Sequence, residues 1–222
     1  MLLTNADLDH VLGLFCLREG EPVNIHAPAG VRSTVERYLG LADILGTFCG
    51  VAWHEPSRAG FEPLPSRTGA KASLMCRAIE LPGKPPPFEK PTPEQPRGPH
   101  CVAYQFLDAK TGGRLLVAPD VSALNEQLLG ALSSSDAVLF DGTFWSADEL
   151  SRFKSSAPKA AEMGHVTIRD CSLDLLAELK LRHRIYIHIN NTNPILCPNS
   201  AERAAIEAAG IVAGTDGLEF DL

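Results

Sequence analysis

Aspartate and histidine side chains stand where several apolar runs of this 222-residue sequence end. The side chains that share this placement are Asp7, Asp9 and His10 in "TNADLDH", Asp120 after "LLVAP", Asp141 after "AVLF", His188 in "RIYIHIN", and His165 just before a predicted helix. Ligands on strand ends converge at one edge of a sheet, where the backbone holds them and loops leave room for a substrate. Imidazole and carboxylate groups are ligands for divalent cations, so the pattern favours a metal site.

Each of these residues, taken alone, also has a structural interpretation. An aspartate after a strand is often a helix cap or a turn residue, and Asp141 in "DGT" fits that description. A histidine within an apolar strand, such as His188, is often a hydrogen-bonded core residue. The spacing alone leaves the two interpretations about equally weighted. The remaining histidines lack this context and are interpreted as structural or exposed: His26, His54, His100 and His183.

The composition is that of a globular protein, with 45% hydrophobic residues and a formal charge of −7. One domain over residues 1–222 is the default expectation for this length. The negative charge argues against nucleic acid as a partner. No apolar run reaches the roughly 18 residues of a membrane helix, and no secretory signal is visible, so a cytoplasmic location is expected. The six cysteines are spaced singly, which favours free thiols over disulfides or a cysteine-ligated zinc.

Strands and helices alternate along the sequence and must position the candidate ligands. Strands are predicted at 22–27, 47–54, 73–81, 101–107, 113–119, 136–142 and 184–190. Helices are predicted just after a cap at Asp9, and at 30–41, 122–132, 146–153, 166–180 and 200–210, with an edge strand or tail at 217–222. Because hairpins interrupt the alternation, the pattern predicts an α/β (α+β) fold of two mixed sheets with outer helices.

Two segments are predicted to lack regular structure. Residues 56–70 are rich in Pro, Gly and Ser and are interpreted as a loop. Residues 82–99 form an insert so dense in proline that a regular helix or a central strand is excluded. This insert is either an ordered loop beside a site or, by the interpretation that we favour, a solvated polyproline-like segment.

"TNADLDHVLGL" resembles the metal loop of the metallo-β-lactamase superfamily, whose pattern is T-H-x-H-x-D-H. Within that superfamily, "LFDGTFWSADE", "MGHVTI" and above all "RIYIHINNTNPIL" resemble the pyrroloquinoline quinone (PQQ) synthesis protein B family. The resemblance implies an αββα sandwich. It also implies that the family's N-terminal quarter, with the opening strands of the first sheet, is absent here. We therefore expect "MLLT" to be an unpaired edge and the isolated chain to be prone to aggregation.

The resemblance also implies a ligand set. Asp9, His10 and His188 correspond to ligands of the second metal of the dinuclear enzymes, and Asp120 to the carboxylate that bridges both metals. The first two histidines of the loop are replaced by Asn5 and Asp7, which we assign to substrate binding. No clear stand-in exists for the third histidine of the first metal, since His100 is a weak candidate. The resemblance thus implies a mononuclear divalent metal.

Further residues receive roles from the same resemblance. His165 matches a histidine that handles protons or orients the substrate in related proteins, and we assign it, with Asp141, to the catalytic group. Three asparagines in the turn after His188 could bind amide or carboxylate groups of a substrate, although turn formation explains them slightly better: Asn190, Asn191 and Asn193.

Two histidines and a carboxylate with open positions form the ligand set of non-haem Fe(II) oxygenases. The resemblance accordingly implies PQQ biosynthesis, by iron-dependent hydroxylation of the tyrosine ring of a Glu–Tyr-derived precursor, with Fe(II) favoured over Zn(II). The alternatives are a soluble carrier of PQQ or its precursor toward the periplasm and, less favoured, a metal-dependent hydrolase. Implied partners are the small-molecule precursor and other PQQ-biosynthesis proteins. A homodimer is also considered, whereas nucleic acid and membrane are not expected.

Overall fold

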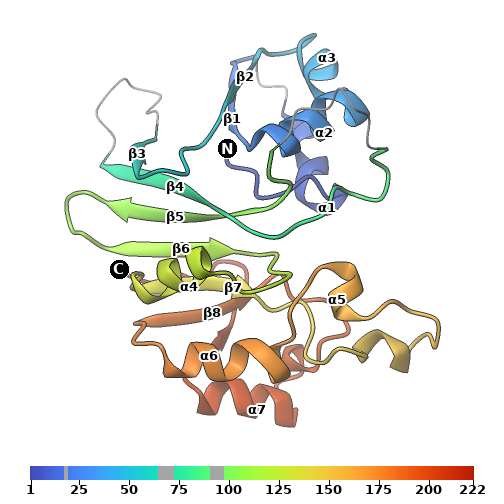
Figure 1. Ribbon diagram of the computed structural model, residues 1–222, viewed down its shortest axis with the longest axis vertical. Helices are drawn as coiled ribbons and strands as arrows, with labels where there is room; N and C mark the ends of the chain where they lie inside the picture. Colours follow the sequence, from blue (N-terminus) through green and yellow to red (C-terminus); the bar gives the residue numbers. More distant parts are fainter. Residues whose placement is uncertain (18–19, 65–72, 91–97) are drawn as a thin grey trace.

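The protein is described by a computed structural model that covers residues 1–17, 20–64, 73–90 and 98–222 (Figure 1). A seven-stranded mixed sheet lies beneath a small parallel sheet of two strands. The strands are β1 (Val23–His26), β2 (Val51–His54), β3 (Glu62–Pro63), β4 (Leu74–Glu80), β5 (Val102–Asp108), β6 (Arg114–Ala118), β7 (Ala137–Asp141), β8 (His183–Ile187) and β9 (Val212–Ala213). The large sheet runs in sequence order from β3 to β9, antiparallel up to β6 and parallel from β6 onward.

Helices cover one face of the parallel half of the large sheet (Figure 1). The α-helices are α1 (Leu8–Val11), α2 (Ala29–Leu39), α3 (Leu41–Leu45), α4 (Glu126–Ser133), α5 (Ala160–Met163), α6 (Leu173–Glu178) and α7 (Ala201–Ala208). Short 3₁₀ turns occupy η1 (Leu12–Cys16), η2 (Glu149–Arg152) and η4 (Pro194–Leu196), and η3 (Ile168–Ser172) is a π turn. None of the helices in the described part of the chain is long and apolar enough to cross a membrane.

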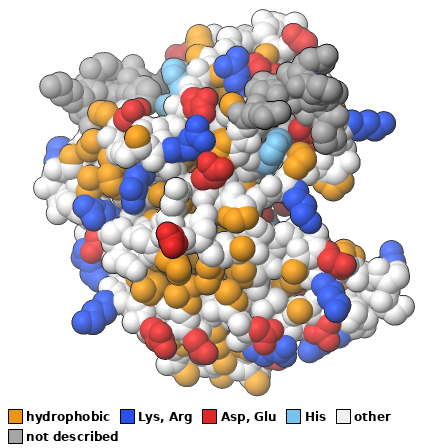
Figure 2. Space-filling model, in the orientation of Figure 1, with side chains coloured by type: hydrophobic (Ala, Val, Ile, Leu, Met, Phe, Trp, Pro, Cys, Tyr) orange, Lys and Arg blue, Asp and Glu red, His pale blue; other side chains and the backbone are white. Residues whose placement is uncertain are grey.

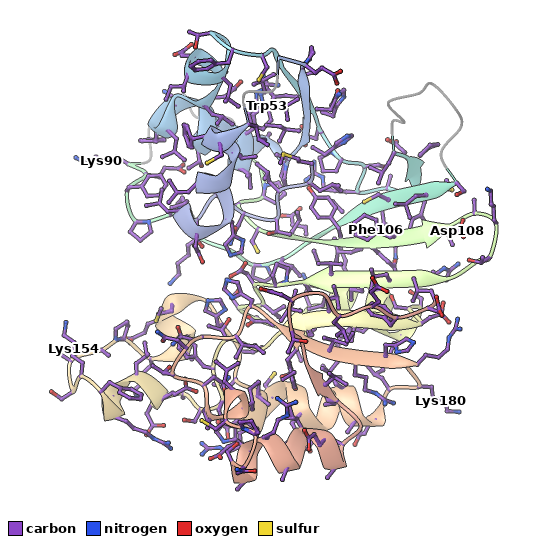
Figure 3. All side chains as sticks on the ribbon, turned by 180° about the vertical axis from the view of Figure 1, so that it is seen from behind. Trp53, Lys90, Phe106, Asp108, Lys154 and Lys180 are labelled. Carbon is purple, nitrogen blue, oxygen red and sulfur yellow. The ribbon has the colours of Figure 1, made fainter. Side chains whose placement is uncertain are left out.

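The main core forms because alternate residues of the strands point to the helical face. Val138 and Phe140 of β7 are fully buried there, together with Leu128 of α4 and Ile206 of α7. The opposite face of β5 carries Phe106, and Asp108 lies at the end of this strand, where the hairpin to β6 begins (Figure 3). Gly112 in that hairpin has a φ of +79°, a conformation that glycine adopts without strain. This packing places the C-terminal ends of β7 and β8 side by side.

The N-terminal residues pair with β1 on one side. The amide of Leu3 donates to the carbonyl of His26 at 2.9 Å, and the amide of His26 donates to the carbonyl of Met1 at 2.8 Å. The hydroxyl of Tyr104 on β5 donates to the carbonyl of Leu3 at 2.9 Å. The expectation of an unpaired edge concerns the other side of "MLLT" and stays a prediction.

The α/β class, with a mixed sheet and outer helices, is confirmed, but several boundaries differ from the prediction. The first sheet has two parallel strands in the described residues and is not mixed. The strand predicted at 47–54 begins at Val51, because Thr47 and Phe48 still bond to the last turn of α3. The helix predicted at 166–180 begins with the π turn, since Thr167 is held by a bridge to Phe144.

The other differences concern caps and tails. Asp7, rather than Asp9, occupies the N-cap position of α1, and Asp9 lies in the first turn. Residues 217–222 form a tail without a strand. Residues 82–90 and 98–99 of the proline-rich insert contain no helix or strand, as predicted, whereas 91–97, and 65–70 of the predicted loop, lie outside the described residues. The prediction of one domain over 1–222 stays a prediction.

Candidate metal centre

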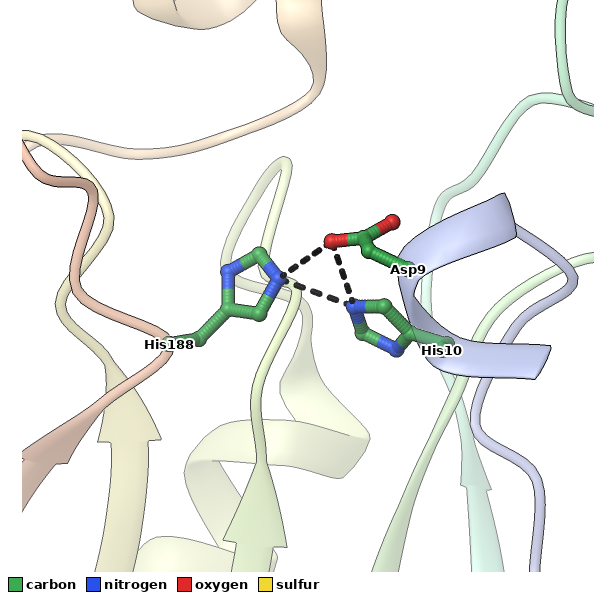
Figure 4. Close-up of side chains that lie close together, drawn as sticks. All are labelled: Asp9, His10 and His188. Carbon is green, nitrogen blue, oxygen red and sulfur yellow. Dashed lines mark hydrogen bonds and ion pairs between the residues drawn. The ribbon is translucent and has the colours of Figure 1, made fainter. Parts of the chain in front are cut away.

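Four predicted ligands meet where α1 faces the C-terminal ends of β6 and β8. The Nε2 atoms of His10 and His188 lie 2.8 Å apart, and Asp9 Oδ2 is 3.7 Å from each of them (Figure 4). Asp120, in the loop after β6, approaches from the buried side, with Oδ2 at 3.5 Å from His10 Nε2 and Oδ1 at 3.9 Å from His188 Nε2. The structure thus brings together His10 and His188, which are 178 positions apart.

The arrangement of these atoms fits a divalent cation. Imidazole nitrogens bind such an ion at about 2.0–2.1 Å, so two of them at a right angle on one ion would be about 2.9 Å apart. The 2.8 Å between the two Nε2 atoms is close to that spacing. The Asp9 side chain is 73% exposed, whereas that of Asp120 is only 10% exposed, so one side of the candidate centre faces solvent. Figure 2 shows a hollow at the right edge of the molecule, between the regions of α1 and α5.

Asp141 is an anchor beneath the centre and does not face the open side. It is 1% exposed, and its carboxylate accepts from the amide of Val121 and the ring Nδ1 of His165, both at 2.8 Å, and from the amide and hydroxyl of Thr143 at 2.9 and 2.6 Å. All of its neighbours are therefore donors. A carboxylate enclosed in this way is suited to positioning other groups, and the assignment of Asp141 to the catalytic group stays a prediction.

His165 lies between this anchor and Asp120. Its Nε2 is 3.8 Å from Asp120 Oδ1, and its ring stacks on that of His188 with centroids 5.4 Å apart. Burial lowers the pKa of His165, but the hydrogen bond and the charge of Asp141 outweigh burial, so that this pKa is raised above its ordinary value. For Asp120, burial has the largest effect and raises the pKa of the carboxyl group, although the charges of the nearby histidines act to lower it. His165 can therefore hold a proton at Nε2, facing the centre.

The side chain of Asn5 bonds to the carboxylates of Asp120 and Asp7. Its amide nitrogen donates to Asp120 Oδ2 at 3.0 Å and to Asp7 Oδ2 at 3.2 Å, while its own Oδ1 is buried without a hydrogen-bond partner in the described part of the chain. Burial raises the pKa of Asp7. Asn5 and Asp7, two of the residues predicted to bind substrate, thus adjoin the centre. The donor group of Asn5 is already used to hold the Asp120 carboxylate.

The turn after β8 contains predicted substrate ligands that differ in their surroundings. Asn193 is 1% exposed, and its amide nitrogen donates to the carbonyls of Gly142 and Thr143 at 2.8 and 3.3 Å. Its Oδ1 accepts from the amide of Ile195 at 3.1 Å. The backbone of two turns thus uses both ends of the Asn193 side-chain amide, and the substrate-binding assignment of Asn193 stays a prediction.

The other two asparagines of this turn are nearer to solvent. Asn190 donates from its amide nitrogen to the hydroxyl of Thr192 at 2.6 Å, and that hydroxyl donates to the buried carboxylate of Glu149 at 2.5 Å. Asn191 is exposed. The substrate-binding assignments of Asn190 and Asn191 stay predictions.

Sequence reasoning missed Thr143. Its hydroxyl lies 2.7 Å from Nδ1 of His188, on the side of the ring opposite the centre. The available signal was its place two residues after the strand that ends in Asp141. His100, the weak candidate for a third histidine, belongs to neither of the two groups of potential ligands in the described residues, which are Asp9–His10–His188 and Asp120–His165–His188.

An apolar pocket of about 380 Å³ adjoins His188. Its walls include Leu139 and Ile187 from β7 and β8, and Leu218 and Phe220 from the C-terminal tail. Pockets of this size and character accept small apolar or aromatic groups. A candidate metal centre and an apolar pocket therefore share one wall.

Comparison with known proteins identifies the family of this chain. The model of a beta-lactamase superfamily domain matches residues 1–189. Coenzyme PQQ synthesis protein B of Cupriavidus necator is 34% identical over 226 residues, and that of Methylobacterium nodulans is 35% identical over 225; each alignment covers 100% of this chain and 72% of the relative.

This chain also resembles solved structures. The structure of Zn²⁺-bound PqqB from Methylobacterium extorquens matches with a TM-score of 0.83 and 32% identity, over 100% of this chain and 72% of that one. A diphosphatase of the PhnP family shares the fold, with a TM-score of 0.61 at 18% identity over 100% of this chain and 71% of that one. The chain belongs to the coenzyme PQQ synthesis protein B family, within the beta-lactamase superfamily.

Proposed function

We propose that this chain acts in PQQ synthesis as a metal-dependent hydroxylase of the tyrosine ring of a small Glu–Tyr-derived precursor. The convergence of His10, His188 and two carboxylates on one point carries this proposal. The names of the relatives support the pathway, and the Zn²⁺-bound relative supports a divalent metal in this family.

The donor set favours Fe(II). Two imidazoles and one or more carboxylates with a side open to solvent are typical of non-haem iron oxygenases, in which substrate and O₂ use the vacant positions. An iron(II) ion held here would supply O₂ activation, and two electrons from an external reductant would be needed so that one oxygen atom enters the ring and the other leaves as water. A zinc hydrolase of this superfamily would instead use histidines at the first two loop positions, where this chain has Asn5 and Asp7.

The residues around the centre suit an aromatic substrate. The apolar pocket beside His188 would hold the ring and exclude water from it. His165, with its raised pKa, would hold a proton on Nε2 close to Asp120 and hand it to or take it from a ring oxygen. Asn190 and Asn191, in the turn after β8, would bind the amide or carboxylate groups of the precursor.

Anaerobic reconstitution with Fe(II), followed by metal quantification and O₂ uptake with a Glu–Tyr peptide and ascorbate as the two-electron reductant, tests this proposal. We expect about one iron per chain in the wild type and product with an added ring hydroxyl by mass spectrometry. The Asp9→Ala/His188→Ala variant should lose both iron and O₂ uptake, whereas the His54→Ala control should keep both. Tight precursor binding without metal or O₂ uptake would support the carrier instead, and zinc-dependent hydrolysis would support a hydrolase.

A further inference from the structure

The hydroxyl of Thr143 lies at the meeting point of three groups. Its Oγ1 is 2.6 Å from Asp141 Oδ1, 2.7 Å from Nδ1 of His188 and 3.2 Å from Nδ1 of His165. Thr143 is 5% exposed and Asp141 is 1% exposed, so these bonds form away from water. A threonine hydroxyl has one proton to donate and two lone pairs with which to accept.

The direction of each hydrogen bond follows from this proton count. Asp141 Oδ1 also accepts the backbone amide of Thr143 at 2.9 Å, and Asp141 Oδ2 accepts the amide of Val121 at 2.8 Å, so both oxygens act as acceptors. The hydroxyl proton of Thr143 therefore goes to Asp141. Its oxygen is left as an acceptor, and the short contact to His188 requires a proton on Nδ1 of that ring.

We propose that Thr143 is a positioning residue that fixes the tautomer of His188. With the proton held on Nδ1, Nε2 presents its lone pair toward His10, Asp9 and Asp120, as a metal ligand must. Metal-binding histidines commonly donate their other ring proton to a carboxylate; here the threonine hydroxyl relays that bond to Asp141. The inference rests on the metal centre of the proposed function but not on hydroxylation.

The fold holds Thr143 against His188 from two sides. A side chain on Gly142 would place its Cβ 2.7 Å from the Cβ of Tyr186, so only glycine lets the ends of β7 and β8 approach this closely. The amide of Gly142 donates to the carbonyl of Ile187 at 2.8 Å. The Asn193 side chain and the Asn190 amide both donate to the carbonyl of Thr143. The asparagine-rich turn thus positions the hydroxyl that orients His188.

The backbone of His188 carries strain that this arrangement must maintain. Its φ is +55°, the only positive value of a non-glycine residue in the described part of the chain. Such a conformation is strained for a residue with a side chain and persists where neighbouring contacts over-determine it. The bond from Nδ1 to Thr143 is one of these contacts. With the Nε2 lone pair of His188 set in this way, the proton of the 2.8 Å contact belongs to His10 in the metal-free protein.

The tautomer can be read directly by ¹⁵N NMR of the histidine rings in the metal-free full chain, in alkaline buffer where the rings are neutral. A His188→Gln variant assigns the signals. We expect the wild type and Thr143→Ser to show the proton of His188 on Nδ1. Thr143→Val keeps the backbone amide and the shape but lacks the acceptor, and it should show a mixed or Nε2-protonated ring. If the wild type shows the proton of His188 on Nε2, this result alone overturns the inference.

Zn²⁺ titration of the same proteins gives the second measurement. Loss of an outer-shell partner commonly weakens metal binding by 10–100-fold, so we expect about that loss in Thr143→Val and near wild-type affinity in Thr143→Ser. Equal affinity of Thr143→Val and wild type would contradict the inference. If these results hold while the iron-loaded protein consumes no O₂ with the peptide, the hydroxylase proposal fails and the role of Thr143 stands.

Discussion

Two pairs of histidine rings in this molecule lie equally close, yet only one of them has the surroundings of a metal centre. The centroids are 4.7 Å apart for His26 and His54 and 4.8 Å apart for His10 and His188. The first pair is stacked at 22° on neighbouring strands of one small sheet, in register. The second pair meets at 61°, edge on, from opposite ends of the chain.

The difference lies in the groups around the rings. His54 uses its Nε2 for a hydrogen bond of 2.8 Å with the side-chain oxygen of Asn24, at the molecular surface. The pair at the candidate centre points both Nε2 atoms at one spot, where Asp9 and Asp120 also arrive. Proximity of imidazoles is therefore a weak indicator of a metal site, and convergent ring nitrogens with carboxylates beside them are a strong one.

The largest effect is expected from the anchor of the second pair. Asp141→Asn replaces one of the two buried acceptor oxygens, each of which accepts from two donors, with an amide group that faces those donors. We expect a loss of about 3–4 kcal/mol in the free energy of unfolding, measured with urea. The pKa of His165 should also fall in an NMR titration, because burial then acts without the opposing carboxylate.

Asn24→Ala is the matched control at the first pair. Its side chain is exposed and bonds only to His54 among the contacts that the structure gives, so the change should stay within about 0.5 kcal/mol. Equal losses in the two variants would remove the contrast between the pairs.

Metal-induced stabilisation should distinguish the pairs next. Zn²⁺ at one hundred times its dissociation constant stabilises a folded protein by about 2.7 kcal/mol, which raises the melting temperature. We expect this increase in the wild type and in His26→Ala, and its loss in His188→Ala. If the Zn²⁺-induced rise in melting temperature is kept in His188→Ala but lost in His26→Ala, the metal binds at the pair of His26 and His54, which contradicts our proposal.

A smaller effect is expected from the turn that supports the second pair. Asn193→Ala leaves the carbonyl of Gly142 without its side-chain donor and the amide of Ile195 without its acceptor, which should cost about 1–3 kcal/mol in urea unfolding. Asn191→Ala, in the same turn but exposed, should change stability by less than about 0.5 kcal/mol. Loss of precursor binding in Asn193→Ala with unchanged stability would instead support its assignment as a substrate ligand.

The smallest effect concerns the pH response of the first pair. Burial, the neighbouring ring of His54 and the N-terminal amine all lower the pKa of His26 below its ordinary value. The folded state therefore favours the neutral ring, and stability should decrease as the pH falls through the unfolded-state pKa of about 6.5. His26→Gln should flatten this decrease in thermal melts recorded from pH 7 to pH 5, and an unchanged profile would assign the response elsewhere.

The residues that meet at the candidate centre could be located from the sequence because strand ends have a recognisable pattern. Apolar runs that stop at Asp120 and His188 predict both the strands and the edge at which their side chains meet, and the parallel order of β6, β7 and β8 realises that prediction. The fold class followed from the same alternation of strands and helices. These features are local in the sequence, and tertiary packing reinforces them.

The supporting residues were harder to predict because their roles depend on contacts between distant segments. A threonine after "DG" reads as turn chemistry, and only the pairing of Asp141 with Ile187 brings its hydroxyl to His188, 45 residues away. Asn193 likewise resembles any turn asparagine until the turn after β7 is packed beside it. The pairing of "MLLT" with β1 could not be read from its four residues, because β1 begins only at Val23, beyond α1 and η1.

The order of the ligands along the chain has a consequence for biosynthesis. Asp9 and His10 are synthesised before Asp120, and His188 follows after β8. The four side chains can therefore meet only after β8 has been synthesised and has docked beside β7. A cation bound by them would link the segment of α1 to the parallel half of the large sheet.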